Sequence, residues 1–418
     1  MSDLKHRTTC RLCESSRLDL VLPIRPSAIG DAFIPKERLS EPQSTYPLDT
    51  YLCLDCGHLQ NIDLVNPEIL FREYTYRSSA SMGLVEHFKT YARAVVEDQG
   101  IPQSSLVVEL GSNDGSLLKA FKALGMRVVG VDPARSIAAA ATAEGIPTLP
   151  EFFSADIATH ICAESGQATV VCANNVFAHI DNMADVVKGI RAVLADDGIF
   201  VFEVSYVPDM IDGMVFDTIY HEHVSHHTLR PLERFFGRFD MTLFDVRRVA
   251  TKGGSIRGFA QVKSTGWRPQ SPELLQMMAE EERRELGKPE IYRAFYQRIE
   301  ERRVQTLAYV DSFIAAGKKV AAYGAATTAT TLLFHFELGS RLSFILDDNP
   351  IKHGLYSPVL HLPVYPSSAL YSEKPALVVI LAWTYATPII KRHAAYLEAG
   401  GKFLVPLPEM RVVEKPIA

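Results

Sequence analysis

A glycine-rich turn between two apolar strands constrains the fold of this chain more than any other feature. Residues 107–116 read VVELGSNDGS, and a second apolar run at 127–131 ends at Asp132. An apolar strand that leads into a glycine turn and a helix lets the backbone approach a ligand closely, and a carboxylate after the next strand can bind ribose hydroxyls. The segment therefore predicts an α/β fold that holds a nucleoside-containing ligand.

The charge of this turn indicates what kind of ligand it binds. An acidic residue, Glu109, precedes the first glycine, which departs from the Gly-x-Gly-x-x-Gly pattern of dinucleotide sites. A carboxylate there would repel a pyrophosphate and suits a cationic ligand. The segment resembles motif I of class I methyltransferases, and the resemblance implies S-adenosylmethionine as the cofactor. The predicted cofactor contacts are Glu109, Gly111, Ser112, Asn113, Asp114, Gly115, Asp132, Phe153 (or its neighbour Phe152) over the adenine, and Asn174.

The length of 418 residues exceeds what one hydrophobic core usually organises, so two or three domains are expected. We predict an N-terminal zinc-binding domain at 1–72, a cofactor domain at 73–266 and a C-terminal Rossmann-like domain at 267–418. In the cofactor domain, helix-compatible segments separate the strand-like runs, which is the pattern of a parallel doubly wound sheet. These runs lie at 106–110, 127–131, 169–173 and 198–204.

Composition and charge exclude several classes of partner. Hydrophobic residues make up 47% of the chain and charged residues 22%, which is typical of a globular protein. The formal net charge of −6 argues against nucleic acid as a partner. The start of the chain lacks an apolar signal core, and apolar runs such as 377–383 are too short to span a bilayer. We expect a cytoplasmic protein that is mainly monomeric.

Four of the six cysteines form two Cys-x-x-Cys pairs, Cys10 with Cys13 and Cys53 with Cys56. Four thiolates complete a tetrahedral zinc shell without an open position, so these pairs predict a structural zinc ion. A redox role would require one pair on a thioredoxin-like strand and helix, and neither pair has that context.

A cluster of titratable residues follows the strand that ends near residue 204. Residues 216–227 read FDTIYHEHVSHH, and the chain beyond a parallel strand lies at the ligand crevice. His223 can accept a proton, Glu222 can fix its tautomer and Tyr220 can donate to an oxyanion. His179, which follows another strand, is a second candidate base. An exposed histidine-rich loop is one alternative, and a transition-metal site is another, built from His221, His223, His226 and His227.

Four features together resemble the sugar C-methyltransferases: the double Cys-x-x-Cys, ELGSNDG, FDTIYHEH, and DDNP after an apolar strand. The resemblance implies methylation at C-3 of a nucleotide-diphosphate 4-keto-deoxysugar, in the biosynthesis of branched sugars. It also implies that His223 is the base, Glu222 orients it, Tyr220 assists at the oxygen, and His179 holds or polarises the substrate.

The same resemblance implies a set of substrate contacts and shows two departures. The implied contacts are Tyr76, Ser79, Lys252, Gly254, Tyr323 and Asp347. Thr328 stands where the family usually has lysine, and Lys252 where it often has histidine, so we hypothesise that Lys252 supplies the diphosphate charge lost at position 328. The alternatives are a sugar O-methyltransferase, a zinc-containing nucleic-acid methyltransferase and a non-catalytic scaffold.

Overall fold

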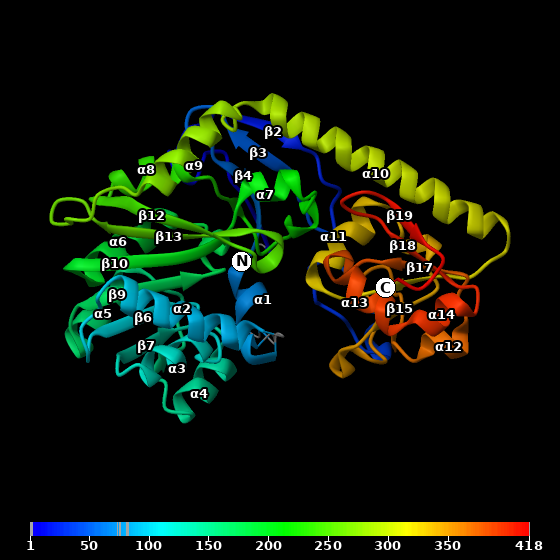
Figure 1. Ribbon diagram of the computed structural model, residues 1–418, viewed down its shortest axis with the longest axis horizontal. Coiled ribbons are helices and arrows are strands. Elements are labelled where there is room, and N and C mark those ends of the chain that lie inside the picture. Colours follow the sequence, from blue (N-terminus) through cyan, green and yellow to red (C-terminus); the bar gives the residue numbers. More distant parts are fainter. Residues whose placement is uncertain (1–2, 73, 75–76, 81–82, 418) are drawn as a thin grey trace.

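The computed structural model describes residues 3–72, 74, 77–80 and 83–417. These residues form two α/β lobes, with a small β domain and a long helix running between them (Figure 1).

The N-terminal segment builds a small antiparallel sheet in the order β11-β4-β3-β2, and a separate pair of strands, β1 and β5. Its elements are β1 (Leu4–His6), β2 (Leu18–Leu22), β3 (Thr50–Cys53), β4 (Leu59–Asn61), β5 (Asp63–Val65) and α1 (Pro67–Phe71). The edge strand β11 (Ser225–His226) comes from the middle of the chain and pairs with β4. The N-terminal sheet is therefore completed by the segment that carries the predicted catalytic residues.

The central lobe contains a seven-stranded sheet in the order β12-β13-β10-β9-β6-β7-β8. Its strands are β6 (Leu106–Leu110), β7 (Arg127–Val131), β8 (Thr148–Leu149), β9 (Ala168–Asn174), β10 (Leu194–Ser205), β12 (Met241–Val249) and β13 (Ser255–Val262). The four strands predicted from the sequence, β6, β7, β9 and β10, are parallel as expected. The sheet also has an edge that was not predicted, where β13 pairs antiparallel with both β10 and β12. Here β12 turns directly into β13, and a hairpin connection produces antiparallel neighbours.

Helices cover both faces of this sheet, which explains why β6 is buried along its whole length. Val107 packs with α2 and α3, whereas its neighbour Val108 packs with α5 and α6 on the opposite face. The helices of the lobe are α2 (Leu84–Asp98), α3 (Ser116–Ala123), α4 (Arg135–Ala143), α5 (Ala155–Ser165), α6 (Met183–Val193), α7 (Val207–Asp212) and α8 (Leu229–Gly237).

The C-terminal lobe has a six-stranded sheet in the order β16-β15-β14-β17-β18-β19, which is parallel except for β19. Its strands are β14 (Val320–Tyr323), β15 (Ile345–Asp347), β16 (Val364–Pro366), β17 (Leu377–Ile380), β18 (Lys402–Val405) and β19 (Arg411–Val413). Its helices are α10 (Pro289–Ala315), α11 (Thr327–His335), α12 (Ala369–Glu373), α13 (Ala386–Arg392) and α14 (Ala394–Glu398). The helix before them, α9 (Pro272–Arg283), packs instead on the central lobe, against α8 and β12 (Figure 1).

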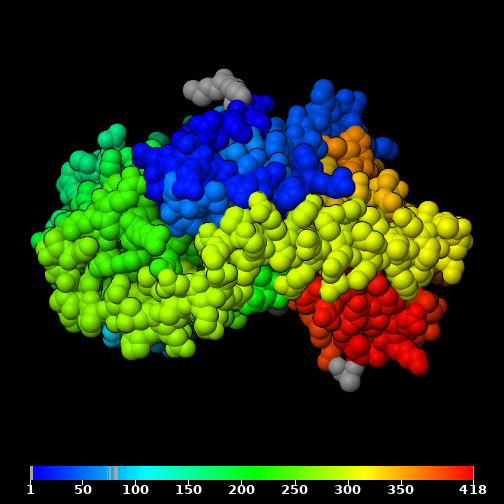
Figure 2. All heavy atoms as spheres, turned by 90° about the horizontal axis from the view of Figure 1, so that it is seen from above, coloured from blue at the N-terminus to red at the C-terminus, as the bar shows by residue number. Residues whose placement is uncertain are grey.

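The long helix α10 runs beside the N-terminal segment and over the C-terminal lobe (Figures 1 and 2). Arg293 near its start forms an ion pair of 2.8 Å with Asp19 on β2. Among the helices that the structure describes, none combines the length and the apolar character needed to cross a membrane.

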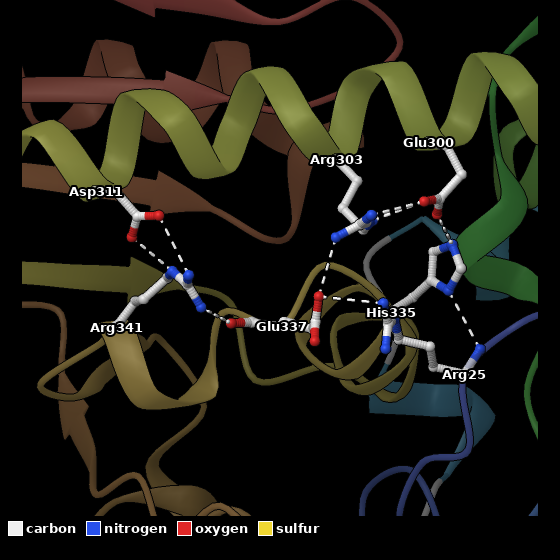
Figure 3. Close-up of polar contacts among 7 residues, drawn as sticks. All are labelled: Arg25, Glu300, Arg303, Asp311, His335, Glu337 and Arg341. Atoms are coloured by element: carbon white, nitrogen blue, oxygen red, sulfur yellow. Dashed lines mark hydrogen bonds and ion pairs between the residues drawn. The ribbon is translucent and has the colours of Figure 1, made fainter.

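A polar network holds the middle of α10 to the residues that follow α11 (Figure 3). Arg303 on α10 bonds Glu337 at 2.9 Å, and Asp311 accepts from Arg341 at 2.6 Å. The buried His335 accepts a hydrogen bond of 3.2 Å at Nδ1 from the backbone N–H of Arg25. Three separate parts of the chain thus meet at one junction.

Candidate active site

A cavity of about 380 Å³ lies at the carboxyl ends of β6, β7 and β9, which is where open α/β sheets bind ligands. Its size falls in the range of small-molecule sites. The lining includes residues predicted for both the cofactor and the chemistry: Gly111, Asn113, Asp132, Phe152, Phe153, Asn174, His179, Tyr220, Glu222 and His223. The structure therefore brings the two predicted groups to one cavity.

Gly111 lies in the glycine-rich turn of residues 107–116, the cofactor turn. Its position leaves no room for a side chain. Its φ of +63° is a left-handed conformation, and a Cβ atom there would lie 2.2 Å from Val176 Cγ2. The N–H groups of Gly111 and Ser112 both donate to the carbonyl of Val131, at 2.7 and 3.2 Å. These bonds fix the turn against the end of β7.

The two aspartates of the predicted cofactor site have different surroundings. Asp132 lines the cavity and accepts from the N–H groups of Asn113 and Ala134, at 2.8 and 2.9 Å. Each of its oxygens keeps a second lone pair that can accept a ribose hydroxyl. Asp114 accepts from Ser116 at the start of α3, so it anchors that helix. Its other oxygen accepts from the Ser79 N–H at 2.9 Å.

The other residues predicted to contact the cofactor include Gly115, Glu109 and Asn174. Gly115 precedes α3 with φ of +72°, and Glu109 is buried just behind the turn. Burial raises the pKa of Glu109 well above its usual value, and the charges of Asp132 and Asp114 raise it further. Asn174 lines the cavity, and its amide group lies beside the Glu109 carboxyl group and partly offsets the rise of that pKa. A cation bound here would favour the ionised form of Glu109, and Asp132 and Asn174 offer hydrogen-bonding atoms, so the site fits a ligand such as S-adenosylmethionine.

His223 is held at both ring nitrogens. Because a carbonyl only accepts, Nδ1 must donate its proton to the Thr218 carbonyl at 2.8 Å, and Nε2 then accepts from the Tyr220 hydroxyl at 2.9 Å. The Nδ1 partner is thus a backbone carbonyl, and the orientation of the ring by Glu222 stays a prediction. Glu222 accepts from the Tyr74 hydroxyl at 3.1 Å. The ring is set with its basic nitrogen toward Tyr220.

Four aromatic rings form a column along the cavity. Phe71 stacks on His179 with 5.5 Å between ring centroids, and His179 lies 5.1 Å from His223. The Tyr220 ring follows at 4.1 Å from His223. Phe71 at the end of α1 was missed by sequence reasoning, because nothing in a short apolar helix marks one residue as facing a distant histidine.

The four predicted metal ligands meet in one cluster, and their sulfur atoms all lie within 4.8 Å of one another. Cys10 and Cys56 are 3.7 Å apart at Sγ, and Cys13 and Cys53 are 3.5 Å apart. A tetrahedron with Zn–S bonds of about 2.3 Å has sulfur–sulfur edges of roughly 3.8 Å, so this donor set fits a zinc ion. Within the described part of the chain it is the one such group of histidine, cysteine or carboxylate ligands. The alternative of a histidine metal site therefore finds no support.

The two Cys-x-x-Cys turns, residues 10–13 and 53–56, are called the zinc knuckle here. The zinc knuckle also contacts residues 216–227, the catalytic segment. Arg11, between the first two cysteines, is buried and donates to the carbonyl groups of Asn61 and Val224. His226 on β11 lies 3.0 Å from the Asn61 side chain. The residues that follow His223 are thus fixed on the N-terminal domain.

The predicted substrate residues are distributed over several places. Ser79 is tied to the cofactor turn through Asp114, as described above. Gly254 packs on Asp209, which lies 2.4 Å from where a Cβ atom would be, and it is not part of the cavity lining. Tyr76 and the side chain of Lys252 lie outside the described residues.

Tyr323 and Asp347 are both in the C-terminal lobe, at the ends of β14 and β15. The Tyr323 hydroxyl donates to Asp348 at 2.9 Å, and Asp347 accepts from the N–H of Ala325 at 2.6 Å. Neither residue lines the cavity described above.

Comparison with known proteins gives matches along most of the chain. Family models match at residues 10–71 (a zinc binding domain), 84–246 (a methyltransferase domain) and 250–408 (a C-methyltransferase C-terminal domain). The C-methyltransferase NovU of Streptomyces niveus is 34% identical over 410 residues, which cover 97% of this chain and 96% of NovU.

Solved structures resemble parts of the chain. The PH0226 protein of Pyrococcus horikoshii OT3 matches 48% of this chain and 97% of its own at 15% identity, with a TM-score of 0.37. Magnesium protoporphyrin IX methyltransferase of Synechocystis PCC 6803 matches 43% of this chain and 79% of its own at 12% identity, with a TM-score of 0.32.

Proposed function

Because the chain belongs to the family of S-adenosylmethionine-dependent C-methyltransferases, we propose that it methylates C-3 of a nucleotide-linked 4-keto-deoxysugar in branched-sugar biosynthesis. The observation that carries the proposal is the position of His223 and Tyr220, which line the same cavity as the cofactor turn. A carbon beside a ketone needs a base to lose its proton, and a base near neutral pKa suits that step.

The proposed reaction needs two groups of this protein near the ketone, a hydrogen-bond donor and a base. Tyr220 donates its hydroxyl proton toward the C-4 ketone oxygen, which stabilises the negative charge that develops there. This movement frees the lone pair of His223 Nε2, which takes the C-3 proton. The C-3 to H electron pair becomes the enolate, whose carbon then forms the new bond to the methyl group.

Bound S-adenosylmethionine would supply an electrophilic methyl group on a sulfonium, whose sulfur would keep the electron pair of the broken sulfur–methyl bond. Glu109, Asp132 and Asn174 would hold it by charge and by hydrogen bonds, and the buried carboxylates favour its positive charge. After transfer, His223 returns its proton to solvent.

We further propose that the C-terminal lobe binds the nucleotide carrier through Tyr323 and Asp347, at the carboxyl ends of β14 and β15. This edge of a parallel sheet is the usual ligand side. The cysteine thiolates kept for zinc suit a reducing compartment, so we propose a cytoplasmic enzyme. We also propose that the enzyme is a monomer.

The test is an assay of methyl transfer to thymidine-, guanosine- and cytidine-diphospho-4-keto-deoxysugars, followed by NMR of the product. We expect a new methyl group on C-3. A C-4 ketone acidifies C-5 as well as C-3, so a methyl group on C-5 would keep the enolate chemistry and correct the position. Methylation of a hydroxyl group would contradict the proposal.

A further inference from the structure

The catalytic segment before His223 is held by the C-terminal lobe rather than by the lobe that binds the cofactor. Asp217 is buried, and its carboxylate accepts a hydrogen bond of 2.8 Å from the indole N–H of Trp383. Trp383 begins the short helix η8 (Trp383–Tyr385), which follows β17. Two residues after Asp217, the carbonyl of Ile219 accepts from the Thr331 hydroxyl at 2.9 Å.

A ring contact adds to these two hydrogen bonds. Phe216 stacks on Phe336 with 5.6 Å between centroids and meets the edge of His335 at 5.4 Å. Phe336 and His335 lie at the end of α11, beside the polar junction with α10 (Figure 3). Three successive anchors of the segment, at residues 216, 217 and 219, therefore belong to one lobe.

Thr218 is the residue between the two hydrogen-bonded anchors, and its carbonyl accepts the Nδ1 proton of His223 at 2.8 Å. This bond fixes which nitrogen of His223 is free to act as a base. The position of the Thr218 carbonyl depends on its two neighbours, because the backbone allows only two soft dihedral angles per residue.

We propose that Trp383 and Thr331 are positioning residues for the base, acting through Asp217 and Ile219 on the Thr218 carbonyl that sets the tautomer of His223. This inference rests on the proposed function for the identity of the base. It assigns the C-terminal lobe a role in proton removal in addition to carrier binding. Neither residue touches the reacting atoms.

The test uses two variants that each remove one donor and keep the side-chain volume close to native, Trp383→Phe and Thr331→Val. The chain offers a matched control for each. Trp267→Phe makes the same change at the other tryptophan, which is 72% exposed. Thr330→Val makes the same change at the buried neighbour of Thr331.

The first readout is ¹⁵N NMR of histidine-labelled protein without substrate, with His223 assigned by comparison with His223→Asn. We expect the Nδ1–H pattern of His223 in the native protein and in both controls, and a shift toward mixed tautomers in Trp383→Phe and Thr331→Val. Unchanged His223 signals in both variants would overturn the proposal, whatever the reaction proves to be.

The second readout is deuterium uptake from D₂O at the carbon beside the ketone of thymidine diphospho-4-keto-6-deoxyglucose, with S-adenosylhomocysteine bound. We expect each variant to slow it roughly tenfold, since misplacement of a catalytic group by about 1 Å can cost about a hundredfold. The Kd for S-adenosylhomocysteine should stay within about twofold of native. An exchange rate that falls only in step with a lower Tm would overturn the positioning role.

The two readouts separate this proposal from the proposed function. If the native enzyme catalyses no exchange with any of the candidate keto-sugars, the proposed function fails. The ¹⁵N spectra then still decide whether Trp383 and Thr331 set the His223 ring.

Discussion

At the scale of single residues, the cofactor turn combines a backbone requirement with a concentration of negative charge. Gly111 has no room for a side chain, and Glu109 is buried behind it near two further carboxylates. Ionisation of Glu109 is unfavourable by itself, because burial and the negative neighbours favour its neutral form. A bound cation would favour the ionised form of Glu109 instead.

This predicts a pH dependence of cofactor binding. A carboxyl group with a raised pKa is protonated at low pH and must release its proton when a cation binds beside it. The Kd for S-adenosylmethionine should therefore fall as pH rises toward the pKa of Glu109, by at most about tenfold per pH unit for one coupled proton. Calorimetry between pH 5 and 8 measures this slope.

The matched variant is Glu109→Gln, which keeps the shape and removes the titration. It should bind more weakly at high pH and lose the slope. A slope that persists in Glu109→Gln would show that another group titrates with binding.

The sequence identified residues whose side chains have distinctive chemistry. It could not identify hydrogen-bond partners that depend only on the path of the chain. The four cysteines meet, and His223 and Tyr220 reach the cavity with the cofactor turn. Thr218 could not be foreseen, because any residue supplies a carbonyl and only the path of the chain selects one. Gly254 has a packing reason to be glycine, because a Cβ atom there would lie 2.4 Å from Asp209, and its contact with substrate stays a prediction.

At the scale of secondary-structure elements, the strands with continuous apolar runs were predictable, and the antiparallel edge of the central sheet was not. β6 and β7 begin and end at the expected residues, because burial on both faces imposes an unbroken apolar pattern. β13 is buried along its whole length although it contains Arg257 and Gln261, and it enters the sheet antiparallel between β10 and β12. Only the hairpin that joins it to β12 determines that direction.

Zinc binding should stabilise the chain after His223 as well as the zinc knuckle itself. Removing the metal should free Arg11 from the Val224 carbonyl and loosen the chain after His223. We expect one zinc ion per chain in the native protein, and a Tm that falls by about 10 °C or more after chelation, since structural zinc contributes folding energy directly.

The matched pair for this prediction is Cys53→Ser and Cys162→Ser. Metal analysis should find zinc lost in the first and kept in the second, because Cys162 lies outside the cluster. Equal zinc content in both variants would contradict the four-cysteine site.

At the scale of the whole molecule, the catalytic segment contacts all three parts of the chain, since the N–H of Val224 also donates to the Ala178 carbonyl of the cofactor lobe at 2.9 Å. Residues 216–219 are fixed by the C-terminal lobe, and the residues after His223 are fixed by the N-terminal domain. The cofactor lobe supplies the turn and His179 from its own strand ends. The three parts are therefore expected to unfold cooperatively, because each completes the others' contacts.

The central claim is that His223 removes a proton from carbon beside a ketone. The most direct measurement is deuterium uptake at that carbon in the presence of S-adenosylhomocysteine, comparing the native enzyme with His223→Asn. We predict a loss of about 100- to 10,000-fold in exchange and in methyl transfer, with the Kd for S-adenosylhomocysteine unchanged. Native exchange and turnover in His223→Asn would contradict the claim.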